Sequence, residues 1–314
     1  MMNLREIGCA LLVTGASLAA PGVAAQAPSC PGIEPEIAAL LQSMAEGGAA
    51  VDFSGVVTLQ RGGDMQILEI AHRVEDGVAH EQLSRLTGQD AAVQRSGHPL
   101  QCLHPGHKLL LSGLSEEGGI CELARHYRFR LIPGERIAGR EAVRLRAEPR
   151  DMYRFGYTFD LDRESALMLR STTVAADQRV IEQYQFASLK MGPAPATGDA
   201  ALEVDAGHPH PDEEVHLRYG MAWDLAWLPE GFTSTDGAPA ESDRKSFTDG
   251  LASFSVFLEP LSRPLKAGEG VERQGSTVAY TRGMRLQQQP VLVTVLGEIP
   301  TNTARMVADS VRIR

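Results

Sequence analysis

The chain lacks the motifs that usually mark an enzyme. Its 314 residues contain no Gly-x-Ser-x-Gly elbow, no phosphate-binding glycine loop, no haem motif and no EF-hand loop. Adjacent carboxylates occur at residues 116–117 and 212–214, but nothing in their sequence context places them around a substrate. These absences predict a protein with no catalytic residues and no cofactor, and they make an exported enzyme of unknown chemistry the least favoured class.

Metal-ligand spacing is also missing. His208, His210 and His216 flank acidic residues, and imidazoles together with carboxylates can bind transition metals. The prolines on both sides of His210, however, favour an extended backbone. His104 and His107 lie across a turn, and no Cys-x-x-Cys or His-x-x-x-His spacing occurs. We therefore predict no metal site.

Positive charge is scarce. The 30 basic and 40 acidic residues give a net charge of −10, which argues against nucleic acid as a partner. The charge is uneven: residues 199–261 hold 13 acidic and 3 basic side chains, and residues 262–314 hold 4 and 8. A solvated linker before an ordinary surface is the simpler interpretation. A basic C-terminal face would suit an acidic peptide or anionic head groups.

Long apolar runs are rare, and the one near the N-terminus has the form of a signal peptide. Arg5 precedes an apolar run from Ile7 to Ala20, which is followed by a small-x-small cleavage site ending at Ala25. The run is too short for a stable membrane span. We expect residues 1–25 to be removed and the mature protein to be exported and soluble.

The chain has only four cysteines, and export to an oxidising compartment would allow them to form disulfides. Cys9 lies in the signal segment, so an odd number remains in an oxidising compartment: Cys30, Cys102 and Cys121. Cys102 and Cys121 are candidates for a disulfide that would contribute about 3 kcal/mol by closing a loop. Whether they are bridged is left open.

Two kinds of periodicity follow the signal segment. Apolar residues at helical spacing predict a helix from Glu34 to Glu46, ended by Gly47-Gly48. A period of two then predicts short antiparallel strands around residues 53–60, 65–73, 91–95, 100–103, 127–131, 143–147, 153–161, 167–174 and 180–186. Their spacing is typical of a barrel or a strongly curved sheet.

One face of these strands is apolar and aromatic. A sheet core is the simpler interpretation for each residue, and an incompletely covered concave face that holds acyl chains is the functional one. The lipid-pocket candidates are Phe53, Val57, Leu59, Phe129, Tyr153, Phe155, Tyr157 and Phe159.

A segment rich in Pro, Ala, Gly and Asp divides the chain. We expect a large domain at residues 28–192, a linker at 193–214 and a smaller domain at 215–314. The smaller domain contains WLPEGF, a hairpin-type turn at Asp249-Gly250, and a β run followed by a Gly-x-x-Pro break and a helix. Its anchors, as core or as partner contacts, are Trp223, Trp227, Phe232 and Phe254.

Three of these segments, WLPEGF, TDGLASFSVF and GEIPTNTARMVADSV, together resemble the C-terminal domain of the RseB/MucB family. The segment from Phe155 to Phe186 is similar to the same family's N-terminal part. The resemblance covers nearly the whole mature chain. It implies an α+β fold, with a LolA-like open antiparallel β half-barrel and a smaller C-terminal α+β domain.

The resemblance also implies a function. Members of the family are periplasmic regulators that bind the periplasmic part of a single-pass anti-sigma factor and shield it from proteolysis. A lipid or lipopolysaccharide-like ligand in the large domain would release the partner. The alternative is a periplasmic carrier of lipids or lipoproteins of the LolA type. A homodimer is left open.

Overall fold

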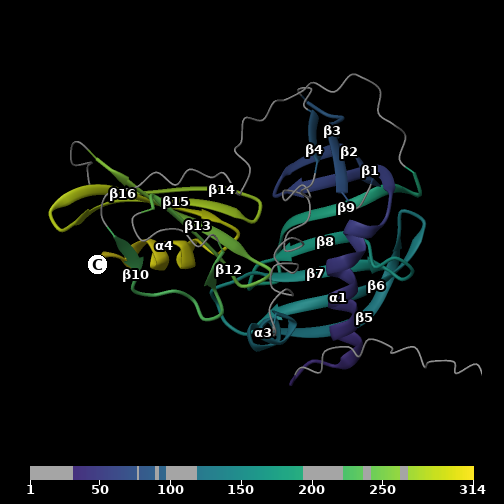
Figure 1. Ribbon diagram of the computed structural model, residues 1–314, viewed down its shortest axis with the longest axis horizontal. Helices are drawn as coiled ribbons and strands as arrows, with labels where there is room; N and C mark the ends of the chain where they lie inside the picture. The colour runs from purple at the N-terminus through teal and green to yellow at the C-terminus, as the bar shows by residue number, and fades with distance from the viewer. Residues whose placement is uncertain are drawn as a thin grey trace, which may run out of the picture.

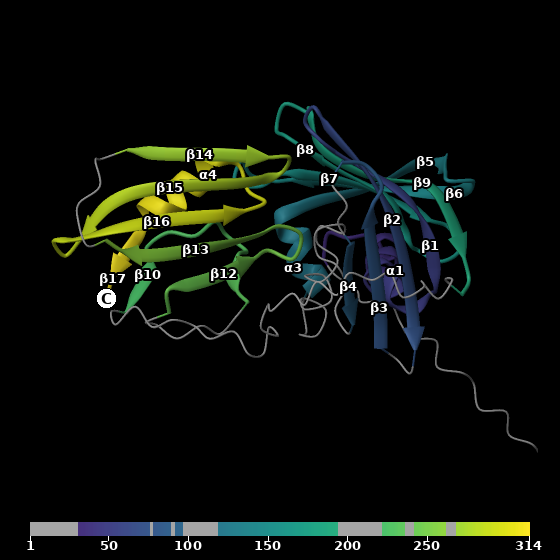
Figure 2. The same ribbon diagram turned by 90° about the horizontal axis from the view of Figure 1, so that it is seen from above.

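The computed structural model describes residues 31–75, 78–88, 92–96, 119–193, 222–235, 242–261 and 268–314. These residues form a larger domain up to residue 193 and a smaller domain from residue 222, which lie side by side (Figure 1). Each domain has an antiparallel sheet with a helix against it (Figure 2). This arrangement confirms the expected α+β class with a second, C-terminal domain.

The sheet of the large domain is open. Its order is β4-β3-β2-β1-β9-β8-β7-β6-β5, so that among the described strands β4 and β5 are the two edges. Every neighbouring pair is antiparallel. The strands are β1 (Phe53–Arg61), β2 (Asp64–Glu75), β3 (Val78–Arg85), β4 (Ala92–Ser96), β5 (Tyr127–Ile137), β6 (Arg140–Pro149), β7 (Gly156–Asp162), β8 (Met168–Val174) and β9 (Val180–Met191).

The inner face of this sheet carries the apolar side chains. Strand pairing places Leu59 opposite Tyr184, Tyr184 opposite Ser171 and Ser171 opposite Phe159, so these residues share one face. Helix α1 (Pro35–Ala50) lies across the inner face (Figure 2). Alternation with period two therefore produces a core on one side only. The helix contributes Ile37, Ala38, Leu41 and Met44 to that core.

The outer face is polar and is held by ion pairs. Asp160 of β7 has a fully buried carboxylate that accepts hydrogen bonds from Arg144 of β6 at 2.8 Å and from Arg170 of β8 at 2.7 Å. The arginine–aspartate ladder joins three strands through charge-assisted hydrogen bonds. The polar residues that alternate with the core positions thus add to the cohesion of the sheet.

The small domain is a six-stranded sheet in the order β11-β12-β13-β16-β15-β14, with a separate β10-β17 pair. Helix α4 (Thr301–Asp309) contacts β15 and β16. The core of this domain contains the fully buried Trp223, whose Nε1 donates to the carbonyl of Ser242. The strands are β10 (Trp223–Leu225), β11 (Thr233–Ser234), β12 (Arg244–Thr248), β13 (Ser253–Pro260), β14 (Glu269–Gln274), β15 (Thr277–Leu286), β16 (Gln289–Gly297) and β17 (Val311–Ile313).

Local structure differs from the sequence expectations in three places. Helix α1 continues through Gly47-Gly48, because glycine weakens a helix by about 1 kcal/mol without ending it. Strand β3 was not expected. The strand expected over residues 153–161 begins only at Gly156, because Asp151 accepts a hydrogen bond from the amide of Tyr153 at 2.9 Å and forms a turn before it.

Other expectations lie outside the described residues. These are the signal segment at residues 1–25, the strand expected at residues 100–103, most of the 193–214 linker, the histidines at 104, 107, 208, 210 and 216, and Cys30 and Cys102. Cys121, at the start of helix α3 (Gly119–His126), is disulfide-bonded. The pairing of Cys102 with Cys121 stays a prediction, as do the domain boundaries.

Candidate functional site at the domain junction

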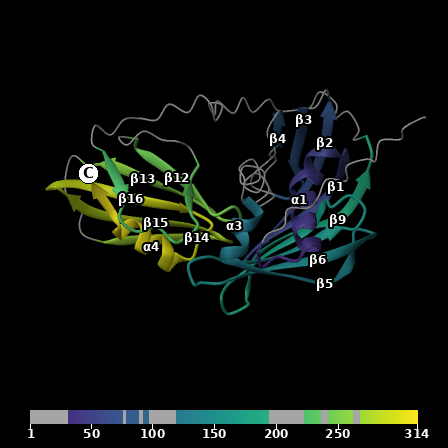
Figure 3. The same ribbon diagram turned by 60° about the horizontal axis from the view of Figure 1, so that its bottom comes forward.

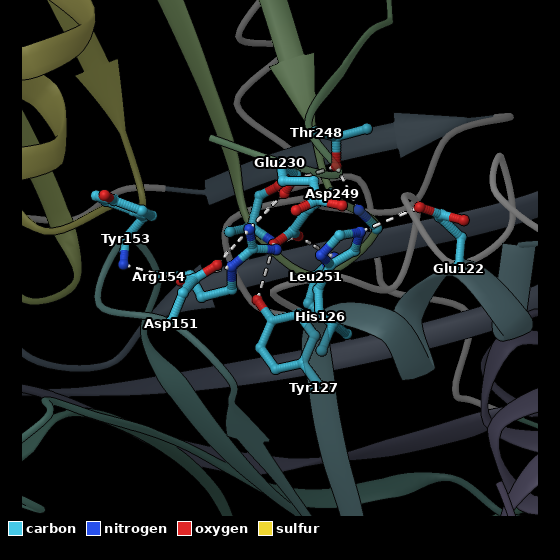
Figure 4. Close-up of polar contacts among 12 residues, drawn as sticks. Glu122, His126, Tyr127, Asp151, Tyr153, Arg154, Glu230, Thr248, Asp249 and Leu251 are labelled. Atoms are coloured by element: carbon cyan, nitrogen blue, oxygen red, sulfur yellow. Dashed lines mark hydrogen bonds and ion pairs between the residues drawn. The ribbon is translucent and has the colours of Figure 1, made fainter. Parts of the chain in front are cut away.

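The three signature segments of the small domain meet the large domain. Figure 3 shows α3 of the large domain facing the small domain. Figure 4 shows the polar contacts formed there by the loop between β12 and β13 and by the turn that contains Glu230. We call the first group of contacts the arginine contact, made by Tyr127, Arg154, Glu230, Phe232 and Asp249.

Asp249 is the acceptor of the arginine contact. Its Oδ2 accepts a hydrogen bond from the Tyr127 hydroxyl at 2.9 Å and one from Arg154 Nη1 at 2.7 Å. Its Oδ1 accepts the amides of Leu251 and Ala252, which shapes the loop. One carboxylate thus orders its own loop and binds two side chains of the other domain.

Arg154 is the donor, and its side chain is fully buried. Besides Asp249, it donates Nη2 to the carbonyl of Glu230 at 2.6 Å and Nε to Asp151 at 3.1 Å. Its guanidinium lies over the ring of Phe232, 5.2 Å from the centroid. Burial is the largest single influence and lowers the pKa of Arg154, but the charges and hydrogen bonds around it, led by Asp249 and joined by Asp151, together outweigh burial and raise the pKa.

The tyrosine of this contact is neutral. Burial raises the pKa of Tyr127 well above its ordinary value, and the nearby Asp249 carboxylate raises it further. A neutral phenol keeps its proton and can donate it to Asp249 in a hydrogen bond. The contact therefore combines one cation, the carboxylates of Asp249 and Asp151, and a neutral donor.

The loop between β12 and β13 also inserts an apolar side chain. Leu251 is 1% exposed and belongs to the core cluster of the large domain. Gly250, with φ +97°, lies against Leu123 of α3, where an added Cβ would come within 2.9 Å of that side chain. In the turn that contains Glu230, Gly231 lies so close to His126 that an added Cβ would be 2.3 Å from the imidazole ring. Both glycines allow a close approach that other residues would prevent.

A half-buried aromatic pair borders the arginine contact. Trp227 of the small domain packs edge-on against Tyr153 of the large domain, with ring centroids 5.2 Å apart. Thr303 of α4 donates its hydroxyl to the carbonyl of Tyr153 at 3.1 Å. Of the four anchors, Trp227 therefore lies at the junction, and so does Phe232 through Arg154. Trp223 and Phe254 lie in the core of the small domain.

A second polar contact, which we call the turn contact, joins the domains elsewhere. Glu182 of β9 accepts hydrogen bonds from the amide and the hydroxyl of Ser276, both at 3.1 Å. Arg61 of β1 pairs with the same carboxylate at 3.3 Å. Ser276 lies in the turn between β14 and β15. The two domains thus meet through side chains at two separate polar contacts.

The eight lipid-pocket candidates lie in packed surroundings. Six are buried, namely Phe53, Val57, Leu59, Phe155, Tyr157 and Phe159; Phe129 packs against the same core, and Tyr153 is half-buried at the junction. A cavity of about 290 Å³ lies instead among outward-facing residues of β1, β2, β3 and β9, including Ser54, Glu69 and Lys190. None of the eight lines it. Their role in lipid binding stays a prediction.

The geometry of the junction is suited to holding two domains together and to binding. Within the part of the chain that the structure describes, no group of three or more His, Cys, Asp or Glu side chains could hold a metal ion. No described helix has the length and apolar character needed to span a membrane. Arg154 and Asp249 are hydrogen-bonded to each other and to further groups of the junction, so that neither is poised to activate a nucleophile.

The fold and the junction define a class of two-domain protein in which an open, curved sheet is fixed to a smaller α+β domain by a buried ion pair. Two family models match: the MucB/RseB N-terminal domain over residues 36–206 and the MucB/RseB C-terminal domain over residues 218–312. The chain belongs to the MucB/RseB family, which confirms the resemblance drawn from the sequence.

Named relatives are regulatory proteins. The chain is 34% identical over 284 residues to the sigma factor AlgU regulatory protein MucB of Pseudomonas aeruginosa, covering 87% of this chain and 89% of that protein. It is 24% identical over 301 residues to the sigma-E factor regulatory protein RseB of Salmonella typhimurium, covering 90% of this chain and 92% of that protein. A crystal structure of MucB in complex with MucA(peri) is similar at a TM-score of 0.68 and 34% identity, covering 88% of this chain and 98% of that chain.

The sequence contained no sign of the junction as a site. Phe232, Asp249 and Gly250 stood out as a hydrophobic anchor and a turn, and Arg154 only as a polar residue on an expected strand. The available signal was the grouping of family-specific motifs in one small domain. Such motifs, when they carry no chemistry of their own, can mark a surface that must fit another domain.

Proposed function

We propose that this protein is a periplasmic regulator that binds the periplasmic part of a single-pass anti-sigma factor. The observation that carries the proposal is the similarity, over 88% of this chain, to MucB in its complex with MucA(peri). Both domains of the family are matched. The proposal makes the protein a binding protein and not an enzyme, and it places the chain after export in the periplasm.

Binding shields the partner from proteolysis in this proposal. A partner that touches both domains gains affinity from a junction that is already ordered, because less conformational entropy is lost on binding. The buried Arg154–Asp249 pair provides that order. Weakening the junction should therefore weaken partner binding even where the partner touches neither residue.

The direct test is an affinity measurement between the mature protein and the periplasmic segment of a single-pass anti-sigma factor from the same genome, by isothermal titration calorimetry. We expect micromolar or tighter binding and slower cleavage of the segment by an added protease. Absence of association at micromolar concentration would refute the proposal. Thr158→Ala, on the outer face of β7, is a control variant expected to bind as the unaltered protein does.

Release by a lipid or lipopolysaccharide-like ligand is the second part of the proposal. The inner face of the large sheet is filled by α1 through Ile37, Leu41 and Met44, so an acyl chain must displace this helix to enter. Amphiphiles should therefore lower partner affinity and increase hydrogen exchange in α1. Loss of the partner without any change in α1 would contradict entry by this route.

A carrier of lipids or lipoproteins is the alternative. It predicts co-purifying acyl ligands and transfer to an acceptor membrane, with little dependence on residues 215–314. The junction argues against such independence, because Leu251 completes the core of the large domain. A homodimer stays a prediction that sedimentation velocity would test.

A further inference from the structure

The turn contact has two carboxylates close to one cation. On the large-domain side, Glu182 is 5% exposed and pairs with Arg61. On the small-domain side, Glu298 follows β16 directly and is half-buried. Glu182 and Glu298 bring two carboxylates to one contact, where Arg61 is the cation that acts on both.

Backbone contacts fix the position of Glu298. The preceding Gly297 pairs with Val278 of β15 and with Phe254 of β13, and the amide of Glu298 donates to the carbonyl of Ser253 at 2.8 Å. The pairing of β15 with β16 ends with Gly297 opposite Val278, and Val278 is two positions from the Ser276 that binds Glu182. Glu182 therefore comes from β9 of the large domain, and Glu298 from the bend directly after β16 of the small domain.

The surrounding groups favour a protonated Glu298. Burial, then the charge of Glu182, raises the pKa of Glu298 to about 7, and Arg61 opposes this increase. Tyr157 of β7 also lies within the influence of both glutamates and of Asp249, but it stays neutral because burial raises its pKa well above the ordinary value. Like charges that share a low-dielectric site cannot both ionise without cost.

We propose that the turn contact is a proton-dependent latch between the two domains, closed when Glu298 is protonated and loosened when Glu298 ionises beside Glu182. The latch concerns this chain alone and does not rest on the proposed partner. The arginine contact lacks such a switch of its own, because its one cation has a raised pKa and its tyrosine stays neutral.

Thermodynamic linkage between proton binding and closure of the turn contact gives the direction of the pH effect. A carboxyl group with a raised pKa in the closed state binds a proton more tightly there than in an opened state with ordinary acidity. Closure is therefore favoured below pH 7 and lost as the pH rises through about 7. The ratio of closed to open molecules should change by up to about tenfold for each pH unit in the window between the two pKa values.

The test uses the two tryptophans of the full mature chain. Trp227 packs against Tyr153 across the boundary, whereas Trp223 is fully buried within the small domain. We expect acrylamide to quench Trp227 fluorescence more strongly at pH 8.5 than at pH 5.5, and small-angle X-ray scattering to show a larger radius of gyration. The indole N–H resonance of Trp223 in NMR spectra should stay constant as the internal reference.

Glu298→Gln identifies the responsible group, because glutamine keeps the size of the side chain and cannot ionise. We expect this variant to remain closed at every pH in the range, while Glu272→Gln on the exposed β14 leaves the transition unchanged. A transition that persists in Glu298→Gln would overturn the latch. So would an unaltered protein whose quenching and radius of gyration do not change between pH 5.5 and 8.5.

Discussion

The two domain contacts use charge in different ways. At the arginine contact, a fully buried cation is matched by carboxylates and by a carbonyl, and its donors have partners. At the turn contact, two carboxylates depend on one arginine whose side chain is 21% exposed. A balanced buried network fixes one geometry, whereas an excess of one sign makes the geometry depend on protonation.

The largest expected effect comes from Arg154→Met. Removing the cation leaves the Asp249 carboxylate buried without its main partner, which should lower the free energy of unfolding by about 3–5 kcal/mol. Urea unfolding followed by circular dichroism measures this. The double variant with Asp249→Asn should recover part of the loss, because no buried charge then lacks a partner. A loss below about 1 kcal/mol for the single variant would mean that the arginine contact is not balanced as described.

The next effect is the pH dependence of stability that Glu298 causes. Its folded-state pKa of about 7 lies above the ordinary 4.5, so its contribution is fully present below 4.5 and is lost as the pH rises to about 7. At about 1.4 kcal/mol per pKa unit, the loss should be at most about 3.5 kcal/mol. Urea unfolding at several pH values would show a smaller decrease for Glu298→Gln than for the unaltered protein. Equal pH profiles would contradict this assignment.

Ser276→Ala tests the turn contact at a residue that has no titratable side chain. The variant removes one of the hydrogen bonds that Glu182 accepts, which should cost about 1–2 kcal/mol because the acceptor is charged and buried. Thermal unfolding measures the loss. The cost should be smaller at pH 8 than at pH 5.5, because the turn contact is already loosened when Glu298 is ionised beside Glu182. A cost independent of pH would show that the two carboxylates do not interact.

The smallest effect is expected at Thr303→Val, beside the arginine contact. The substitution keeps the shape of the side chain and removes its hydrogen bond to the carbonyl of Tyr153, at a cost of about 1 kcal/mol. Hydrogen exchange should increase in the 151–155 turn and stay constant in the core of the small domain. A uniform increase throughout the small domain would show that Thr303 stabilises the domain itself and not the junction.

Much of the fold could be predicted from periodicity. The strands around Tyr127, Val143 and Val180, the hairpin at Asp249-Gly250 and the strand–break–helix order at the C-terminus are confirmed. Alternation also placed apolar residues on one face, since successive side chains of a strand point to opposite sides. One error arose where a single side chain redirected the backbone, as Asp151 does before Tyr153.

The candidate site could be predicted only in part. Trp227, Phe232 and Asp249 stood out in the sequence, the first two as core or partner-binding residues and the third as part of a turn. Their role at the junction depends on Arg154, which lies 95 positions from Asp249 along the chain. No local pattern encodes such a pair, because both residues also suit an exposed surface.

The sequence by itself determined the α+β class, the division into two domains and the family, because hydrophobic alternation and motif spacing are local properties of the chain. Only the tertiary structure decided which charges become buried partners. Arg154 meets Asp249, and Glu182 meets Ser276 across 94 positions, because the two domains stack in one orientation. The same stacking brings Glu298 under the electrostatic influence of Glu182, and burial together with that charge raises its pKa.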